Sequence, residues 1–241
     1  MLYPAELRAP GWCYKSAMRR RQASVAGLML GIVLAAVGGV DAQELRLADG
    51  RVAVAAGIVL AGPERSAEGL APVDLATVAL DRHGRLRAQL RAADGGWLQA
   101  ALVARGEAIV APADDVPAAA LTELLGLERT ARAQGIGVWA DGAHGPWPAE
   151  RVAAARGGYV LVRGTVAGLA RRGAFTYLDF GTDWRRDFTL RADNRDLKAF
   201  ARAGLAIESL QGRRILARGW LFESAGPMIE LIHPAQIEVE E

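Results

Sequence analysis

A stretch rich in glycine and proline near the middle of the chain constrains its folding more than any other feature. It reads ADGAHGPWPAERVAAARGG and occupies residues 140–158. Glycine and proline interrupt regular elements, and on both sides of this stretch apolar and polar residues alternate as they do in half-buried strands. We therefore expect two folded blocks, residues 43–140 and 158–241, joined by a linker at 141–157 and preceded by a distinct segment at 1–42.

The first block is expected to contain strands followed by helices. Residues 44–47 and 51–60 should form strands around a turn at Asp49-Gly50, and residues 73–80 and 85–91 should form a second pair. A short helix that ends before Gly106, a strand at 108–110 and a longer helix that ends at Gly135 should follow. This order is typical of a small β-barrel with helices packed against it.

The second block is expected to contain five strands and one helix. The strands are predicted at residues 159–168, 174–180, 187–190, 215–222 and 228–232. The helix should begin at Asn194, whose side chain is suited to capping, and end at Gly204. This number and order of elements fit a barrel of the oligonucleotide-binding (OB) type. The predicted fold class is therefore mainly β with helices (α+β), with tandem small OB-type β-barrels behind an N-terminal hydrophobic signal or anchor helix.

Segment 1–42 has the composition of an export signal. Three arginines at 19–21 precede an uncharged run at 23–40, which ends in the small-residue cleavage pattern VDA at 40–42. The run has about 18 residues, which is also long enough for a retained membrane-spanning helix. Met18 stands directly before the arginines and is an alternative start. In either case the positive charges predict that residues 43–241 are exported, either periplasmic or anchored to the inner membrane and facing the periplasm.

The charge of the folded part argues neither for nor against an anionic partner. Of the 29 basic and 27 acidic residues in the chain, residues 43–241 hold 24 basic and 25 acidic ones. The single cysteine, Cys13, lies in the leader, so we expect neither a disulfide nor thiol chemistry in the mature chain. With no other cysteine and only three histidines, a zinc site is not expected, and no cofactor is predicted.

Three segments of the first block carry a resemblance to a known family. They read LADGRVAVAAGI (47–58), LDRHGRLRAQLRAADGGWLQAALVARGEAIV (80–110) and LERTARAQGIGVWA (127–140). In their order and spacing, residues 44–140 resemble the thermonuclease (staphylococcal nuclease-like) family, whose active members are secreted, calcium-dependent nucleases on an OB barrel. The segments VRGTV, TYLDFGTDWRRDFT and GPMIELIHPAQIE make the second block similar to OB-like modules that follow such a domain in bacterial exported proteins.

The resemblance implies a catalytic set that this sequence largely lacks. The family uses carboxylates to hold calcium and to orient water, and arginines to bind the phosphate. In the register set by Gly57-Ile58, the metal aspartate, the water-orienting glutamate and the first phosphate arginine are replaced by Val59, Gly62 and Val54. The remaining candidates for catalysis are Arg85, which follows a His-Gly turn as in the family, His83 in that turn, and Glu64 from a shifted register.

These losses predict a barrel without the reaction, because a single acid–base group alone contributes about 10²–10⁴-fold. No metal site is predicted, and calcium would be required only if nuclease activity survives.

An arginine-rich strand in the first block has two interpretations. Arg85, Arg87, Gln89 and Arg91 alternate with apolar residues. They form either the wet face of a half-buried strand or, through Arg85 and Arg87, an anion-binding face.

In the second block, basic and aromatic residues gather around a predicted hairpin tip. OB barrels bind single strands with aromatic platforms and basic side chains. The candidates for ligand binding are Arg171, Arg172, Tyr177, Trp184, Arg185 and Arg186. Nearby carboxylates (Asp179, Asp183 and Asp187) should offset these arginines, and four other aromatic residues are expected in the core: Phe175, Phe180, Phe188 and Trp220.

Three functions remain compatible with the sequence. The favoured one is a non-catalytic exported protein whose barrels bind an envelope protein or a polymer, with single-stranded nucleic acid or another polyanion as the candidate polymer. The second is a weak or atypical calcium-dependent nuclease. The third is a membrane-anchored structural or assembly factor that retains its leader at the inner membrane.

Overall fold

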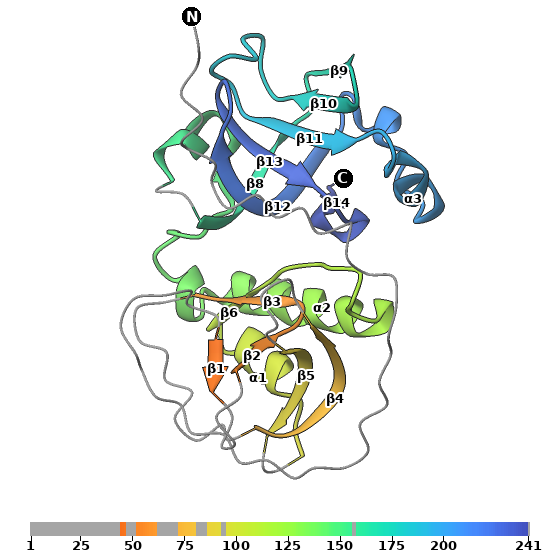
Figure 1. Ribbon diagram of the computed structural model, residues 1–241. Helices are drawn as coiled ribbons and strands as arrows, with labels where there is room; N and C mark the ends of the chain where they lie inside the picture. Colours follow the sequence, from red (N-terminus) through yellow and green to blue (C-terminus); the bar gives the residue numbers. More distant parts are fainter. Residues whose placement is uncertain are drawn as a thin grey trace, which may run out of the picture.

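A computed structural model describes residues 44–46, 52–61, 72–80, 86–92, 95–155 and 158–240. The fold is mixed α+β with mostly strands, as the sequence predicted in this coarse form. Figure 1 shows the two blocks one above the other, with helix α2 of the first block facing the strands of the second.

The described part of the first block contains six strands and two α-helices. Its elements are β1 (Glu44–Arg46), β2 (Val52–Ala55), β3 (Ile58–Leu60), β4 (Pro72–Leu80), β5 (Leu86–Ala92), α1 (Leu98–Ala104), β6 (Ala108–Val110) and α2 (Ala118–Gln134). Four strands form a sheet in the order β1-β2-β5-β4, in which β2 and β5 run parallel, while β3 pairs with β6. The two predicted hairpin pairs, β1 with β2 and β4 with β5, are both confirmed as antiparallel.

The strand predicted at 51–60 is divided in two. Gly57 has a φ of 84° and turns the chain, so that β2 remains in the four-stranded sheet and β3 leaves it for β6. A Cβ at this position would lie 3.0 Å from a methyl of Val116. The division therefore follows from a backbone conformation and a close approach that both favour glycine.

Helix α2 ends where the sequence predicted. Gly135 follows the last turn with a φ of 63°, and its N–H donates to a carbonyl of that turn. Leu121, Leu124 and Ala131 are buried on the inner face of the helix, together with the carboxylate of Glu128. A charged group thus shares the buried face with the apolar residues.

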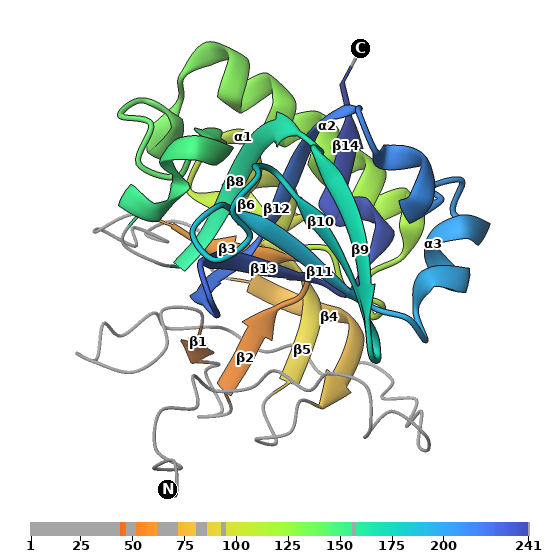
Figure 2. The same cartoon turned by 90° about the horizontal axis from the view of Figure 1, so that it is seen from above.

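The second block is a strongly curled sheet. Its elements are β7 (Trp147–Pro148), β8 (Gly158–Thr165), β9 (Gly168–Arg172), β10 (Phe175–Asp179), β11 (Thr189–Asp193), α3 (Leu197–Arg202), β12 (Arg214–Glu223), β13 (Pro227–Leu231) and β14 (Ile237–Val239). The strand order is β7-β8-β12-β13-β11-β10-β9, with β14 also paired to β12, and β11 runs parallel to β13. Because β8 and β9 are consecutive in the chain, the sheet curls back toward its own beginning, and Figure 2 shows β8 and β9 crossing the other strands as a half-barrel.

Two expectations about this block are corrected. The helix begins after Asp196 and not at Asn194, because the Asn194 side chain accepts a hydrogen bond from Thr176 Oγ1 (2.7 Å) and donates one to the Gly173 carbonyl (3.1 Å). Asn194 therefore fastens the β9–β10 hairpin. Part of the predicted linker also belongs to the second block, since β7 pairs with β8 and Val152 is fully buried in the second core.

A third apolar core joins the two blocks. Residues of β3, β6, α2 and the following 3₁₀ turn (Gly137–Trp139) pack against the outward side of β8 and β12, and the buried members are Val59, Ile109, Ala131, Trp139, Tyr159, Leu161 and Leu216. The first block thus covers part of one face of the second sheet.

Among the described residues, no helix has the length and apolar character needed to cross a membrane. The signal or anchor predicted at 1–42, the alternative start at Met18 and Cys13 lie outside those residues.

Candidate binding surface

One face of the curled sheet carries arginine and aromatic side chains. Along β10, Thr176 and Leu178 are buried, so the alternating residues 175, 177 and 179 lie on the opposite face. Cross-strand partners share a face, and Tyr177 lies opposite Arg191 of β11. We call the set on this face and in the adjoining 181–187 loop the arginine–aromatic surface: Arg172, Phe175, Tyr177, Trp184, Arg185, Arg191 and Phe222.

Trp184 is the centre of the loop side of this surface. Its side chain is 40% exposed. The guanidinium carbon of Arg172 lies 4.7 Å from the centroid of the indole ring, and that of Arg185 lies 5.0 Å away. The guanidinium carbon of Arg172 also lies 5.9 Å from the centroid of the Tyr177 ring. At these distances each cation is attracted to the face of the ring, so the rings hold both arginines in place although the arginines are exposed.

The sequence predicted that neighbouring carboxylates would offset these arginines, but the structure does not pair them. Asp187 accepts a hydrogen bond from the backbone N–H of Asp183 (2.8 Å), and Asp183 accepts one from the N–H of Arg185 (3.1 Å). The two carboxylates therefore shape the 181–187 loop. Within the described part of the chain, neither Arg172 nor Arg185 forms an ion pair with a carboxylate.

Arg191 is held more firmly than the other two arginines. Its guanidinium carbon lies 4.7 Å from the ring of Phe175 and 5.4 Å from the ring of Phe222. Its Nη2 donates to Glu230 at 3.1 Å, whereas its Nε is buried without a hydrogen-bond partner. The two rings and the carboxylate fix the plane of this guanidinium on the sheet.

Two of the predicted binding residues do not join this set. Arg171 points to the other side of β9, where it forms an ion pair with Glu208 (3.2 Å). Arg186 is exposed, and its described hydrogen bond is a backbone one to the Asp183 carbonyl. The side on which Arg171 lies follows from the alternation of strand β9, and the position of Arg186 follows from the turn of the loop. The sequence alone did not show either of them.

Three members of the surface were missed by sequence reasoning. Phe175 was expected in the core, and Arg191 and Phe222 were not considered as binding residues. The register of β10 against β11 supplies the missing information, because it places Tyr177 opposite Arg191 and Phe175 opposite Asp193. From sequence, the run Thr-Leu-Arg-Ala-Asp at 189–193 already shows the alternation that directs Arg191 outward.

The other predicted core aromatics behave differently from one another. Phe188 is 1% exposed and Phe180 packs against the second core, which confirms the prediction for these two. Trp220 is 41% exposed, so the prediction is wrong for this residue. Trp220 meets Tyr159 edge to face at 5.6 Å, beside the core that joins the two blocks.

In the first block, the interpretation of the arginine strand as a wet face is wrong at two positions. Arg87 forms a two-point ion pair with Asp115 (2.6 and 3.3 Å) in which both side chains are largely buried. Gln89 is also buried, where it accepts a hydrogen bond from the Trp97 indole and donates one to the Ala56 carbonyl. Arg91 is exposed as predicted, and Ala88 and Leu90 are fully buried. Arg87 is thus already bound to a carboxylate.

The proposed catalytic candidates Glu64, His83 and Arg85 lie outside the described residues. Within the part of the chain that the structure describes, no three His, Cys, Asp or Glu residues gather in a way that could hold a metal ion.

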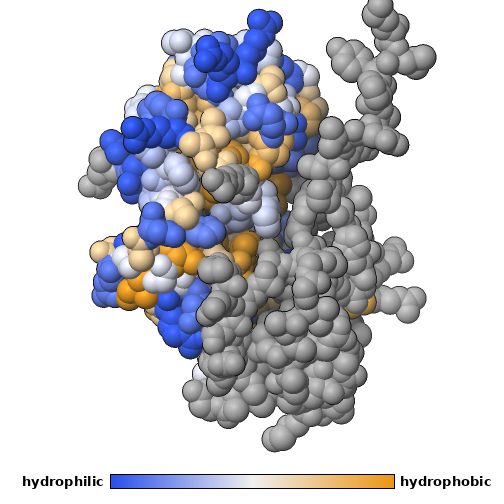
Figure 3. All heavy atoms as spheres, turned by 90° about the vertical axis from the view of Figure 1, so that its left-hand side faces the viewer, coloured by the Kyte–Doolittle hydropathy of each residue, from blue (hydrophilic) through white to orange (hydrophobic). Residues whose placement is uncertain are grey.

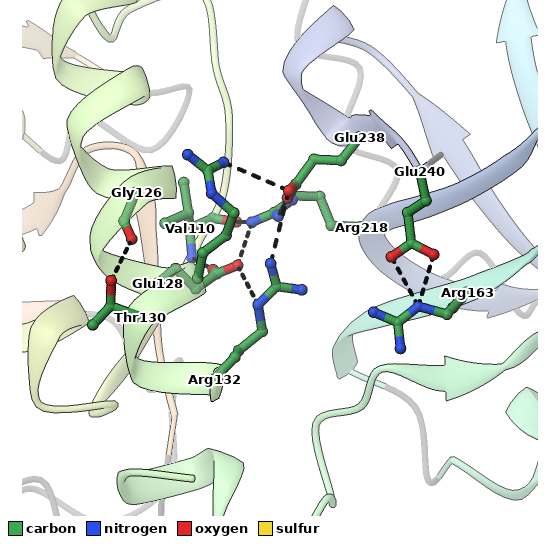
Figure 4. Close-up of polar contacts among 10 residues, drawn as sticks. Val110, Gly126, Glu128, Thr130, Arg132, Arg163, Arg218, Glu238 and Glu240 are labelled. Carbon is green, nitrogen blue, oxygen red and sulfur yellow. Dashed lines mark hydrogen bonds and ion pairs between the residues drawn. The ribbon is translucent and has the colours of Figure 1, made fainter. Parts of the chain in front are cut away.

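A network of buried charges lies where the two blocks meet (Figure 4). Arg218 of β12 is fully buried and donates to Glu128 of α2 at 2.7 Å, to Glu238 of β14, and at 3.5 Å to the Val110 carbonyl. The second oxygen of Glu128 accepts a hydrogen bond from the Val110 N–H at 2.7 Å. Arg132 lies 3.7 Å from both carboxylates.

The pKa directions within this network follow from burial and from the charges nearby. Burial opposes the charged form of Arg218, but Glu128 and Glu238 outweigh it and raise the pKa of Arg218. Burial lowers the pKa of Arg132 and raises that of Tyr159. Arg218 therefore stays charged in an apolar setting, because two carboxylates surround it.

No protein-family model matches the chain, and no curated protein matches it.

Proposed function

We propose that the protein is an exported, non-catalytic binding module built from tandem OB-type barrels, and that its arginine–aromatic surface binds a polyanion in the cell envelope. The observation that carries the proposal is the stacking of Arg172 and Arg185 on Trp184 without a carboxylate partner among the described residues. Exposed guanidinium groups that are held in place by a ring are suited to binding phosphate, sulfate or carboxylate groups.

The strand order supports the barrel type. An OB barrel joins an antiparallel hairpin to a later hairpin through one parallel pair, and its first strand closes on the later hairpin. The second block follows this scheme: β10 pairs with β11, β11 runs parallel to β13, β13 pairs with β12, and β12 pairs with β8. The described part of the first block repeats the central steps with β1, β2, β5 and β4.

The sequence supports the absence of catalysis. The positions at which the resembled thermonuclease family carries its metal aspartate and water-orienting glutamate hold Val59 and Gly62. Val59 belongs to the core that joins the two blocks, so this position contributes to packing.

The surface of the second block is mixed in hydropathy on one side. On the side drawn in Figure 3, hydrophilic residues lie beside exposed hydrophobic ones over this block. Candidate ligands are single-stranded nucleic acid, another polyanion, or an acidic segment of an envelope protein.

The proposal is tested by measuring binding of the purified protein to a fluorescent single-stranded oligonucleotide and to heparin at several salt concentrations. Arg172→Ala and Arg185→Ala should each weaken binding by about tenfold or more, since charge-assisted contacts contribute about 1.5–3 kcal/mol. Arg171→Ala is the matched control, because it removes the same charge from the neighbouring position on the other side of β9, and it should change binding little. Equal effects of all three variants would contradict the proposed surface.

The nuclease alternative is tested on the same preparation. Single-stranded DNA and RNA are incubated with calcium or with chelator, beside the Arg85→Ala variant. We expect no cutting. Calcium-dependent cutting that Arg85→Ala abolishes would overturn the non-catalytic assignment.

A further inference from the structure

We infer that the ligand of this surface is a single-stranded nucleic acid whose bases stack along a row of rings that ends at Trp220, beside the first block. This inference rests on the proposed function, since it names the polyanion that the arginine–aromatic surface binds.

The row crosses the strands of the sheet. Phe175 and Tyr177 lie on β10, with their rings 6.4 Å apart at 61°. Arg191 on β11 connects Phe175 to Phe222 of β12, because its guanidinium contacts both rings. Neighbouring strands are about 4.8 Å apart, so the path from β10 through β11 and β13 to β12 covers about 14 Å. This is enough length for a few nucleotides.

Trp220 continues the row of rings along β12, two residues before Phe222. Alternation places Trp220 on the same face as Phe222, while Ala217 and Ile215 of this strand point into the second core. Trp220 has 41% of its surface exposed, and its ring meets that of Tyr159 edge to face.

The first block ends the row beyond Trp220. The next residues of β12 on the same face are Arg218 and Leu216, both buried against α2 and β6. A ligand strand that follows the rings from Trp184 therefore reaches the junction of the two blocks and cannot continue on this face. The arrangement predicts a short binding site with one closed end.

The chemistry of the surface favours nucleic acid over other polyanions. Sulfated or carboxylated polysaccharides need cationic groups but have no flat aromatic groups. Here each of the three arginines lies over at least one aromatic ring, and Trp184 and Trp220 leave about two fifths of their surface exposed. Bases stack on such rings without sequence preference, and guanidinium groups reach the phosphates between them.

The test compares three probes on the full-length protein: a fluorescent thymidine 15-mer, an abasic 15-mer with the same phosphate backbone, and heparin. The thymidine 15-mer should bind at least about tenfold more tightly than the abasic one, because each stacked base contributes substantially. Trp220→Leu should remove a large part of this difference without changing abasic binding. Trp220→Phe, which keeps a ring, should preserve most of it.

The outcomes separate the inference from the proposed function. Equal binding of thymidine and abasic strands, or unchanged thymidine binding by Trp220→Leu, would refute base stacking on this row and leave a general polyanion site. If heparin were the one probe of the three that binds, base stacking on this row would also be refuted. Failure of all three probes to bind would overturn the proposed function as well. Circular dichroism and urea unfolding of Trp220→Leu establish that a lost difference is not lost folding.

Discussion

At the scale of single residues, the most consequential position is Arg218. Its guanidinium is fully buried, and its partner Glu128 is 0% exposed as well. Taking two charges out of water is costly, and only their mutual attraction and the hydrogen bonds around them offset this cost. The two residues come from different blocks, so this buried pair links the blocks, in addition to the contacts within each block of Arg218 with Glu238 and of Glu128 with Arg132.

Arg218→Met should destabilise the protein by about 3–5 kcal/mol, because it leaves Glu128 buried without its closest cation. Urea unfolding measures this change. The double variant Arg218→Met with Glu128→Gln should recover a large part of the loss, since glutamine removes the unpaired charge and can still accept from the Val110 N–H. A loss below about 1 kcal/mol for the single variant would contradict the role of the pair.

His233 should make stability depend on pH. Burial lowers its pKa more than Asp114 raises it, and its Nδ1 accepts a hydrogen bond from the Ala235 N–H at the start of a 3₁₀ turn. The unfolded chain therefore takes up a proton at a higher pH than the folded protein does. The contribution of neutral His233 is complete above its ordinary pKa of about 6.5 and is lost as the pH falls through the folded value.

We therefore expect the free energy of unfolding to decrease between about pH 7 and pH 5, and part of this decrease should disappear in His233→Asn. Asparagine keeps a side-chain acceptor for the 3₁₀ turn but does not titrate. Identical pH profiles for the two proteins would rule out His233 as the titrating group.

At the scale of elements, the end of α2 is held by a close backbone contact. Gly137, with a φ of 60°, approaches Gly106 so closely that a Cβ on it would lie 2.4 Å from the Gly106 carbonyl oxygen. The Val138 N–H donates to that same oxygen at 2.9 Å. The Gly-x-Trp at the end of the first block thus fastens α2 to the turn after α1.

Gly137→Ala should cost more stability than Gly135→Ala. Both glycines have a positive φ, but a Cβ at Gly135 meets nothing within 4 Å. Gly135→Ala should cost about 1 kcal/mol from backbone conformation, and Gly137→Ala about 1–3 kcal/mol more from the clash. Thermal or urea unfolding of the two variants gives the comparison. Equal losses of stability would show that the close backbone contact at Gly137 adds nothing to the cost of the substitution.

At the scale of the whole molecule, the joining core and the Arg218 network couple the two blocks. Leu216 belongs to the second sheet but is buried with Ile109 and Ala131 of the first block. Unfolding of either block would expose this core and separate the charges. The two blocks should therefore unfold together.

Unfolding followed by far-ultraviolet circular dichroism and by tryptophan fluorescence should give one coincident transition. Leu216→Ala should shift the whole transition by about 2–5 kcal/mol. Leu231→Ala, which lies in the second core alone, should shift it as a whole too, because the blocks are coupled. Two separated transitions, with only one moved by Leu231→Ala, would show that the blocks unfold independently.

The sequence by itself determined the positions of most strands and helices and the glycine that ends α2. These features depend on alternation and on capping within a few residues, which are local and visible in one chain. It also determined that the residues expected for metal-assisted hydrolysis are absent from their usual positions. The sequence indicated that arginine and aromatic residues gather near the β9–β10 hairpin, but not which of them meet.

Only the tertiary structure decided how the charges are used. Alternation alone would leave Arg87 and Arg218 in water, yet Arg87 meets Asp115 at a separation of 28 residues and Arg218 meets Glu128 at a separation of 90. Tertiary contacts likewise place Arg172 over the ring of Trp184 and Trp220 at the junction of the blocks. A side chain on the outer face of a strand is solvated, paired or stacked according to what packs against that face, and this depends on segments far away in the chain.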